Sequence, residues 1–119
     1  MEREIEKLTE RIISFRDARD WKQFHNPKDV ALSMVLEAGE VMEHFQWKNK
    51  EEMEKHVLVH KHEIGEELAD VLYWILLMRQ DLDIDVLEAL DKKIAVNENK
   101  YPGEKAKGNA KKYTELEKE

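Results

Sequence analysis

Apolar residues recur at steps of three and four along most of this chain, and few residues interrupt that pattern. Near the start, the recurrence places Ile5, Leu8, Ile12 and Phe15 on one face of a helix. Only four glycines and two prolines occur in 119 residues, a balance that suits amphipathic helices better than turn-rich sheets. The pattern therefore predicts an all-α fold.

Caps and prolines mark where the helices are expected to begin and end. Asn26 followed by Pro27 is typical of a helix start, because asparagine accepts a backbone N–H and proline at the first position needs no donor. Asp83 or Asp85 can cap the last helix, which must stop before Pro102 because proline disfavours helix in the residue ahead of it. The expected helices cover about residues 4–20, 26–46, 51–59, 60–79 and 86–101.

The length of the chain suits one domain spanning residues 1–119, with 103–119 as a polar tail. No internal repeat or linker divides it. The longest apolar run, residues 68–78, is interrupted by Asp70 and is shorter than the roughly 20 residues that a membrane span needs. We therefore expect no membrane partner, and we interpret residues 60–79 as a central helix or a helix at a subunit interface.

Charge and cysteine content exclude several classes of function. The net charge of -7 argues against binding to nucleic acid, which depends on clustered Lys and Arg. The chain has no cysteine, so a disulfide framework, a thiolate zinc site and a cysteine nucleophile are all excluded. The first ten residues are charged and lack the apolar stretch of a signal peptide, so a cytoplasmic location is expected.

Four carboxylates form two pairs of the same spacing on two expected helices. Glu37 and Glu40 are three positions apart, as are Glu67 and Asp70, so each pair projects from one side of its helix. Both pairs border an apolar stripe, where unpaired carboxylates are costly unless a cation compensates them. Four oxygen donors suit a hard ion such as Mg²⁺, or Mn²⁺ in its place. A solvated helix face is the alternative interpretation.

Two other kinds of metal site fit the sequence less well. A di-iron carboxylate bundle needs Glu-x-x-His pairs, but Glu40 and His44 are four positions apart, so the pattern fails. His56 and His60 have the spacing of zinc ligands, but no Glu follows His56 to complete a metalloprotease motif. Surface histidines are the simpler interpretation.

The carboxylate pairs and their flanking segments resemble a known family. Glu37-x-x-Glu40 followed by Glu67-x-x-Asp70 resembles the signature of the MazG-like all-α nucleoside triphosphate pyrophosphohydrolases. The flanks are similar to the dCTP pyrophosphatase branch of that family. The matching segments are Arg19-Asp20-Trp21-x-Gln23-Phe24-His25-x-Pro27, Gly39-Glu40, Phe45-Gln46-Trp47-Lys48, Glu66-Glu67-Leu68-x-Asp70-Val71-Leu72, and the tail residues Asn97, Lys100-Tyr101-Pro102, Gly108, Ala110 and Lys112-Tyr113-Thr114.

The resemblance implies a four-helix bundle that assembles as a homotetramer, a dimer of dimers, with active sites formed by more than one chain. It implies that the four carboxylates Glu37, Glu40, Glu67 and Asp70 bind Mg²⁺. Residues implied to surround the nucleotide are Trp21, His25, Trp47 and Asn97. Residues implied to contact phosphate are Lys93, Lys100, Lys112 and Tyr113. Two positions depart from the family pattern: Trp74 stands where animal enzymes carry a tyrosine near the sugar, and Ile12 replaces a histidine beside the pocket.

These observations lead to the hypothesis of a Mg²⁺-dependent enzyme that hydrolyses dCTP, or its 5-modified forms, to dCMP and pyrophosphate. Ions held by carboxylates can neutralise phosphate charge and position water, with Glu40 as the residue that activates water and Glu63 as an extra ligand or a solvated side chain. Two alternative functions stay open. One is a pyrophosphohydrolase of broad or non-cytidine preference, and the other is a catalytically silent helical protein that binds partners.

Overall fold

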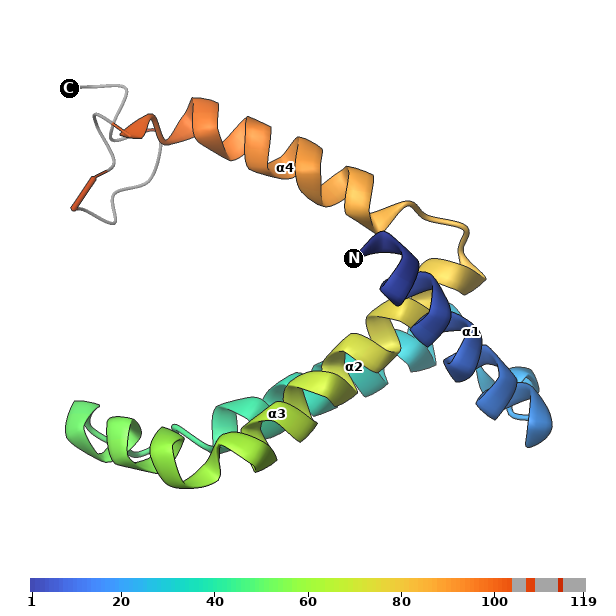
Figure 1. Ribbon diagram of the computed structural model, residues 1–119, viewed down its shortest axis with the longest axis horizontal. Coiled ribbons are helices and arrows are strands. Elements are labelled where there is room, and N and C mark those ends of the chain that lie inside the picture. The colour runs from blue at the N-terminus through green and yellow to red at the C-terminus, as the bar shows by residue number, and fades with distance from the viewer. Residues whose placement is uncertain (104–106, 109–113, 115–119) are drawn as a thin grey trace. The chain divides into compact units, whose positions relative to one another are not determined.

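The computed structural model describes residues 1–103, 107, 108 and 114, and these residues contain helices and no strand. The elements are α1 (Glu2–Ala18), the short 3₁₀ helix η1 (Lys22–Phe24), α2 (Pro27–Glu43), α3 (Lys50–Asp81) and α4 (Val86–Lys100) (Figure 1). The predicted all-α class is confirmed.

The chain forms two compact units. Met1–Asp83 contains α1, η1, α2 and α3, and Ile84–Glu119 contains α4. The single domain and the four-helix bundle stay predictions. Among the described residues, no helix combines the length and the apolar character that crossing a membrane requires.

The predicted helix starts are confirmed by their capping contacts. Asn26 Oδ1 accepts a hydrogen bond from the backbone N–H of Asp29 at 2.9 Å, with Pro27 at the first helical position of α2. Of the two cap candidates for α4, Asp85 is the N-cap, and its side chain accepts from the N–H of Glu88 at 3.0 Å. Each cap satisfies a donor that the first turn would otherwise leave unpaired.

The α3 helix joins two segments that the sequence predicts separately. It begins with a capping box in which Asn49 and Glu52 exchange side-chain-to-backbone hydrogen bonds. It then runs to Asp81 as one helix, but His60 has non-helical angles, with φ -114° and ψ 26°. The predicted boundary between 59 and 60 is therefore a kink inside one long helix, not the end of a helix.

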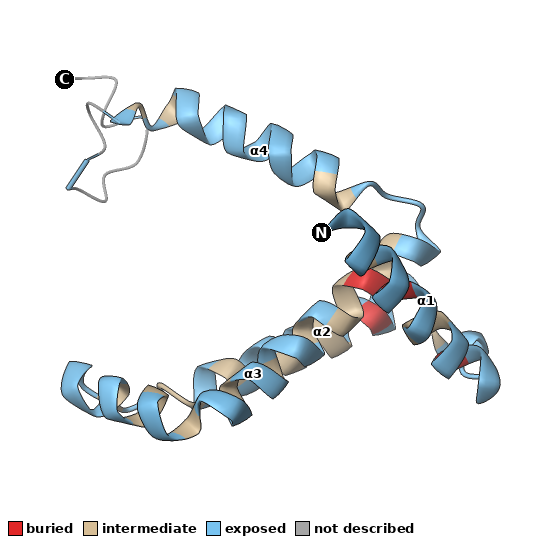
Figure 2. Ribbon diagram, in the orientation of Figure 1, coloured by how far each residue is buried: buried red, intermediate tan, exposed pale blue. Residues whose placement is uncertain are grey.

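The most buried side chains lie where α1, α2 and α3 meet. Val30 on α2 and Leu76 and Leu77 on α3 are at most 5% exposed, and Figure 2 shows the buried positions gathered at this point of the Met1–Asp83 unit. From there α2 and α3 run side by side as an antiparallel pair (Figure 1). Because α2 and α3 pack along their length, the carboxylate pair on α2 faces the helix that carries the other pair.

The face of α1 that packs inward differs from the predicted one. Leu8 and Phe15 are 44% and 41% exposed, whereas Thr9 and Arg16 are buried. Polar contacts with α3 explain the difference, because Arg79 donates to Thr9 Oγ1 at 3.4 Å and Arg16 Nη1 donates to Asp81 Oδ2 at 2.7 Å. Two contacts with charged donors therefore orient α1 on α3, and half of its apolar stripe is left open.

Candidate active site

Glu37 occupies a position in α2 that would normally carry an apolar residue. Val30, Met34 and Val41 are buried or half-buried at steps that include Glu37, since residues 30, 34, 37 and 41 share one helix face. That face packs on α3. Glu37 is therefore half-buried because of its place in the helix pattern.

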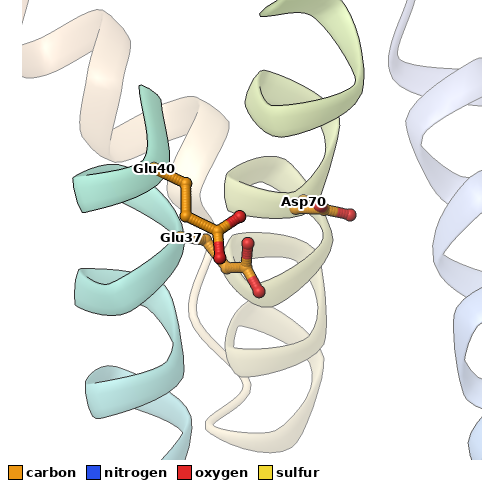
Figure 3. Close-up of side chains that lie close together, drawn as sticks. All are labelled: Glu37, Glu40 and Asp70. Carbon is orange, nitrogen blue, oxygen red and sulfur yellow. The ribbon is translucent and has the colours of Figure 1, made fainter. Parts of the chain in front are cut away.

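The carboxylates of Glu37, Glu40 and Asp70 converge from two helices. Their oxygen ligand atoms all lie within 4.8 Å of one another, and Figure 3 shows Glu37 and Glu40 on α2 and Asp70 on α3. Glu40 and Asp70 are exposed, so the cluster has a protected side at Glu37 and an open side toward solvent. Within the described part of the chain, no other group of three or more His, Asp or Glu side chains converges in this way.

The electrostatics of this cluster favour a bound cation. Burial, together with the charges of Glu40 and Asp70, raises the pKa of the Glu37 carboxyl. Its Oε2 atom is buried without a hydrogen-bond partner, although buried polar atoms are normally satisfied. A divalent ion coordinated by oxygen would remove both costs at once.

Glu67 lies beside this cluster with a partner of its own. Its Oε2 forms an ion-pair contact with Nε2 of His44, the residue that ends α2. Glu67 is close enough to Glu37 for its charge to contribute to the raised pKa of Glu37. Three of the four predicted ligands therefore form the convergent group, and the fourth is held next to it by a histidine.

The contact of His44 with Glu67 is not predicted by the sequence pattern. His44 Nδ1 is 2.7 Å from Nε2 of His56, and the rings of His56 and His60 stack with their centroids 4.4 Å apart. The zinc alternative at His56 and His60 gains no third converging ligand among the described residues. Helical spacing places His44 on the same face as Glu37 and Glu40, but its contact with Glu67 also depends on how α2 packs against α3.

Aromatic residues predicted to lie near the nucleotide form two separate ring contacts. His25 and Trp74 form an edge-to-face contact with ring centroids 5.5 Å apart, and Trp74 is one helical turn beyond Asp70 on α3. Trp21 contacts Phe15 edge-to-face at 5.6 Å. Burial, followed by the charge of Arg16, lowers the pKa of His25. Because Trp74 is one turn beyond Asp70, the contact between His25 and Trp74 lies next to the carboxylate cluster along α3.

Trp47 lies in the turn between α2 and α3. Its side chain is 91% exposed and its φ is 68°. The left-handed conformation is uncommon for a bulky residue, and no packing in the described structure accounts for a tryptophan there. An exposed indole ring offers a flat surface for stacking.

The cationic candidates lie in the second unit. Lys93, Asn97 and Lys100 are separated by four and three positions on α4, which places them along one helix face. Lys112 and Tyr113 lie outside the described residues. These five assignments stay predictions.

The sequence profile of the MazG-like family matches residues 32–116, a range that includes all four predicted ligands. The chain belongs to the MazG-like family. The matched range crosses the boundary between the two units, so the MazG-like relationship covers α4 as well as the carboxylate cluster.

Curated proteins and a solved structure are also similar to this chain. The chain is 36% identical over 104 residues to dCTP pyrophosphatase 1 from Mus musculus and from Homo sapiens, covering 86% of this chain and 61% of each relative. It therefore spans about three fifths of the length of these relatives. The crystal structure of a pyrophosphatase from Archaeoglobus fulgidus is 37% identical, with a TM-score of 0.79 over 83% of this chain and 93% of that chain.

Proposed function

We propose that this chain is a divalent-metal-dependent nucleoside triphosphate pyrophosphohydrolase that converts dCTP and water to dCMP and pyrophosphate. The observation that carries the proposal is the convergence of Glu37, Glu40 and Asp70 within 4.8 Å in a member of the MazG-like family. The names of the relatives, dCTP pyrophosphatase 1 and a pyrophosphatase, support the reaction and the base preference.

The residues of the cluster fit a hard divalent ion. The unpartnered Oε2 of Glu37 and the raised pKa of its carboxyl both call for a cation, and an all-oxygen donor set suits Mg²⁺ or Mn²⁺. Glu37, Glu40 and Asp70 would hold the ion, with Glu67 as the fourth ligand. When bound, the ion supplies charge neutralisation for the triphosphate and a polarised water.

The protein side chains have distinct tasks in this proposal. Glu40 is the exposed carboxylate next to the half-buried Glu37, and we assign it to orient the attacking water and accept its proton. Hydrolysis breaks the anhydride bond between the α- and β-phosphates, and the elements of water are divided between dCMP and pyrophosphate. No covalent intermediate with the protein is required.

Recognition of the nucleotide is assigned to the aromatic and cationic residues. Trp21 and Trp47 are 42% and 91% exposed, which leaves ring surface available for a base. Trp74, which contacts His25, lies one turn beyond Asp70 on α3. An asparagine side chain both donates and accepts, as a cytosine edge requires, and we assign Asn97 to it. The residues assigned to phosphate are Lys93, Lys100, Lys112 and Tyr113.

We also propose that the active form is a homo-oligomer, a dimer of dimers. Leu32, Val35 and Leu36 on α2 are 54–65% exposed, and Leu68 and Leu72 on α3 are 54% and 45% exposed. So many large apolar side chains on two adjacent helices are typical of a surface that another subunit covers.

The test of the function is pyrophosphate release from a panel of canonical and 5-modified NTPs and dNTPs, measured with Mg²⁺ and with EDTA. We expect release that EDTA abolishes, with the highest kcat/KM for dCTP. Highest turnover of another nucleotide would keep the reaction and overturn the cytidine assignment. No release from any nucleotide would contradict the enzymatic proposal and favour a protein that binds partners.

Replacing Trp47 with alanine should weaken nucleotide binding without affecting the fold. A base stacked on an aromatic side chain contributes roughly 1–3 kcal/mol, so the nucleotide Kd should rise by about 5-fold to 150-fold. Because the side chain is 91% exposed, the free energy of unfolding should change by less than about 0.5 kcal/mol. Calorimetric titration with a non-hydrolysable dCTP analogue measures the first quantity, and urea unfolding measures the second.

Trp47→Phe is the matched control, because it keeps a flat ring in the same turn. It should retain most of the nucleotide affinity, and neither variant should change the affinity for Mn²⁺. An equal loss of nucleotide and Mn²⁺ affinity in Trp47→Ala would show that Trp47 has a structural role instead.

A further inference from the structure

A row of histidines leads from the carboxylate cluster to the kink of α3. Glu67 contacts His44, His44 contacts His56, and His56 stacks on His60. The first contact joins the end of α2 to the middle of α3, and the second joins it to the N-terminal part of α3. Three histidines therefore form a continuous series of contacts that ends at the Glu67 carboxylate.

Each ring nitrogen of His44 has a polar atom as its neighbour. Nε2 faces Oε2 of Glu67, and Nδ1 is 2.7 Å from Nε2 of His56. A neutral His44 that donates from Nε2 to the carboxylate must accept at Nδ1, so His56 then donates from its own Nε2. In that arrangement, the contact with His56 favours the tautomer of His44 that presents an N–H to Glu67.

The burial of this contact separates it from an ordinary surface pair. The side chains of His44 and Glu67 are 13% and 25% exposed. On the same helix as Glu67, His62 and Glu66 form a pair at 2.7 Å whose side chains are 85% and 64% exposed. Solvent screens the second pair, whereas the first is protected and its geometry is constrained by a second histidine.

We propose that His44 is a positioning residue that holds the Glu67 carboxylate at the edge of the ion site, and that His56 fixes the ring of His44. This rests on the proposed function, in which Glu67 is a ligand of the divalent ion. A carboxylate has two oxygens, so the contact of Oε2 with His44 would leave Oε1 available as a ligand. Replacing a residue that hydrogen-bonds to a metal ligand typically lowers metal affinity or activity by about 10–100-fold.

The test is the binding of Mn²⁺ to the full chain without nucleotide, followed by electron paramagnetic resonance. We expect His44→Leu to raise the Kd for Mn²⁺ about tenfold, and His44→Gln, which keeps an N–H donor, to recover part of the affinity. His56→Leu should cause a smaller loss in the same direction. His62→Leu is the matched control and should bind Mn²⁺ as the unaltered protein does.

A double-mutant cycle separates positioning from a general effect on the fold. If His44 acts through Glu67, His44→Leu should cause no further loss in a Glu67→Gln background. An equal loss in both backgrounds would overturn the proposal, as would unchanged affinity in His44→Leu where Glu67→Gln alone weakens binding. If only Glu67→Gln weakens binding, the proposed function still stands. Failure of the unaltered protein to bind Mn²⁺ would overturn both proposals. Circular dichroism shows whether His44→Leu folds, and if it does not, the Mn²⁺ affinity of His56→Leu decides the test.

Discussion

Replacing Asp70 with asparagine is expected to lower kcat/KM for pyrophosphate release by on the order of a thousandfold, because metal coordination contributes several kcal/mol to stabilising charge in the transition state. Asp70 is the one member of the convergent group that α3 supplies. Without its charge, α3 would contribute only Glu67, which is paired with His44. A continuous assay of pyrophosphate release from dCTP measures the effect.

Asp70→Asn should leave the fold intact and change its electrostatics in a defined direction. Asp70 is exposed, so helix content should not change. The charge of Asp70 is, after burial and the charge of Glu40, a cause of the raised pKa of Glu37. The pKa of Glu37 should therefore fall toward its ordinary value in the variant, as NMR titration of the carboxyl group would show.

A matched pair on α2 controls for the loss of a negative charge. Glu40→Gln should reduce hydrolysis as severely as Asp70→Asn, whereas Glu43→Gln should have full activity. Glu43 is exposed and lies one turn beyond Glu40 on the same helix, outside the convergent group. Full activity in both Glu40→Gln and Asp70→Asn would remove the carboxylate cluster from the reaction.

The helices and the convergence of carboxylates could be predicted because both follow from local spacing. A three-residue step puts Glu37 and Glu40 on one side of a helix, whatever else the chain does. A short turn then sets the next helix antiparallel to the first. Caps at Asn26 and Asp85 are equally local, since each involves a side chain and an N–H three residues away.

Contacts between distant residues could not be predicted in this way. Thr9 and Arg16 are buried because α3 supplies Arg79 and Asp81 as partners 70 and 65 positions away. Nothing in the α1 sequence marks these polar residues as more buried than Leu8 or Phe15. The contact of Glu67 with His44 likewise depends on the register of α2 against α3, which helical periodicity leaves open.

The aromatic residues mark the limit of what spacing alone can predict. The position of Trp47 beside a helix end favours a core anchor over a binding residue, but its 91% exposure argues against the core anchor. His25 and Trp74 are 49 positions apart in the sequence and in contact in the fold. A family resemblance named these residues, but only the structure shows which of them lie together.

Replacing Asp81 with alanine is expected to destabilise the Met1–Asp83 unit by about 3 kcal/mol, because removing one partner of a buried ion pair leaves the other charge uncompensated. The Arg16 side chain is 2% exposed, and its Nη1 lies 2.7 Å from Asp81 Oδ2. The hydrogen bond with Asp81 is the main cause of the raised pKa of Arg16. Asp81 also ends α3, where a negative charge opposes the helix dipole, so a loss near the low end of the usual range is expected.

Asp17 and a double replacement make this prediction specific to the buried pair. Asp17 lies 3.7 Å from Arg16 Nε with its side chain 57% exposed, so Asp17→Ala should cost no more than about 1 kcal/mol in urea unfolding. Arg16→Met combined with Asp81→Leu should recover most of the stability, since apolar side chains of similar volume often replace a buried pair without loss. Equal losses in Asp17→Ala and Asp81→Ala would contradict the argument, because they would mean that Arg16 reaches solvent when Asp81 is removed. The double replacement keeps α1 packed on α3 without charges, and it therefore distinguishes the contribution of the ion pair from that of the packing around it.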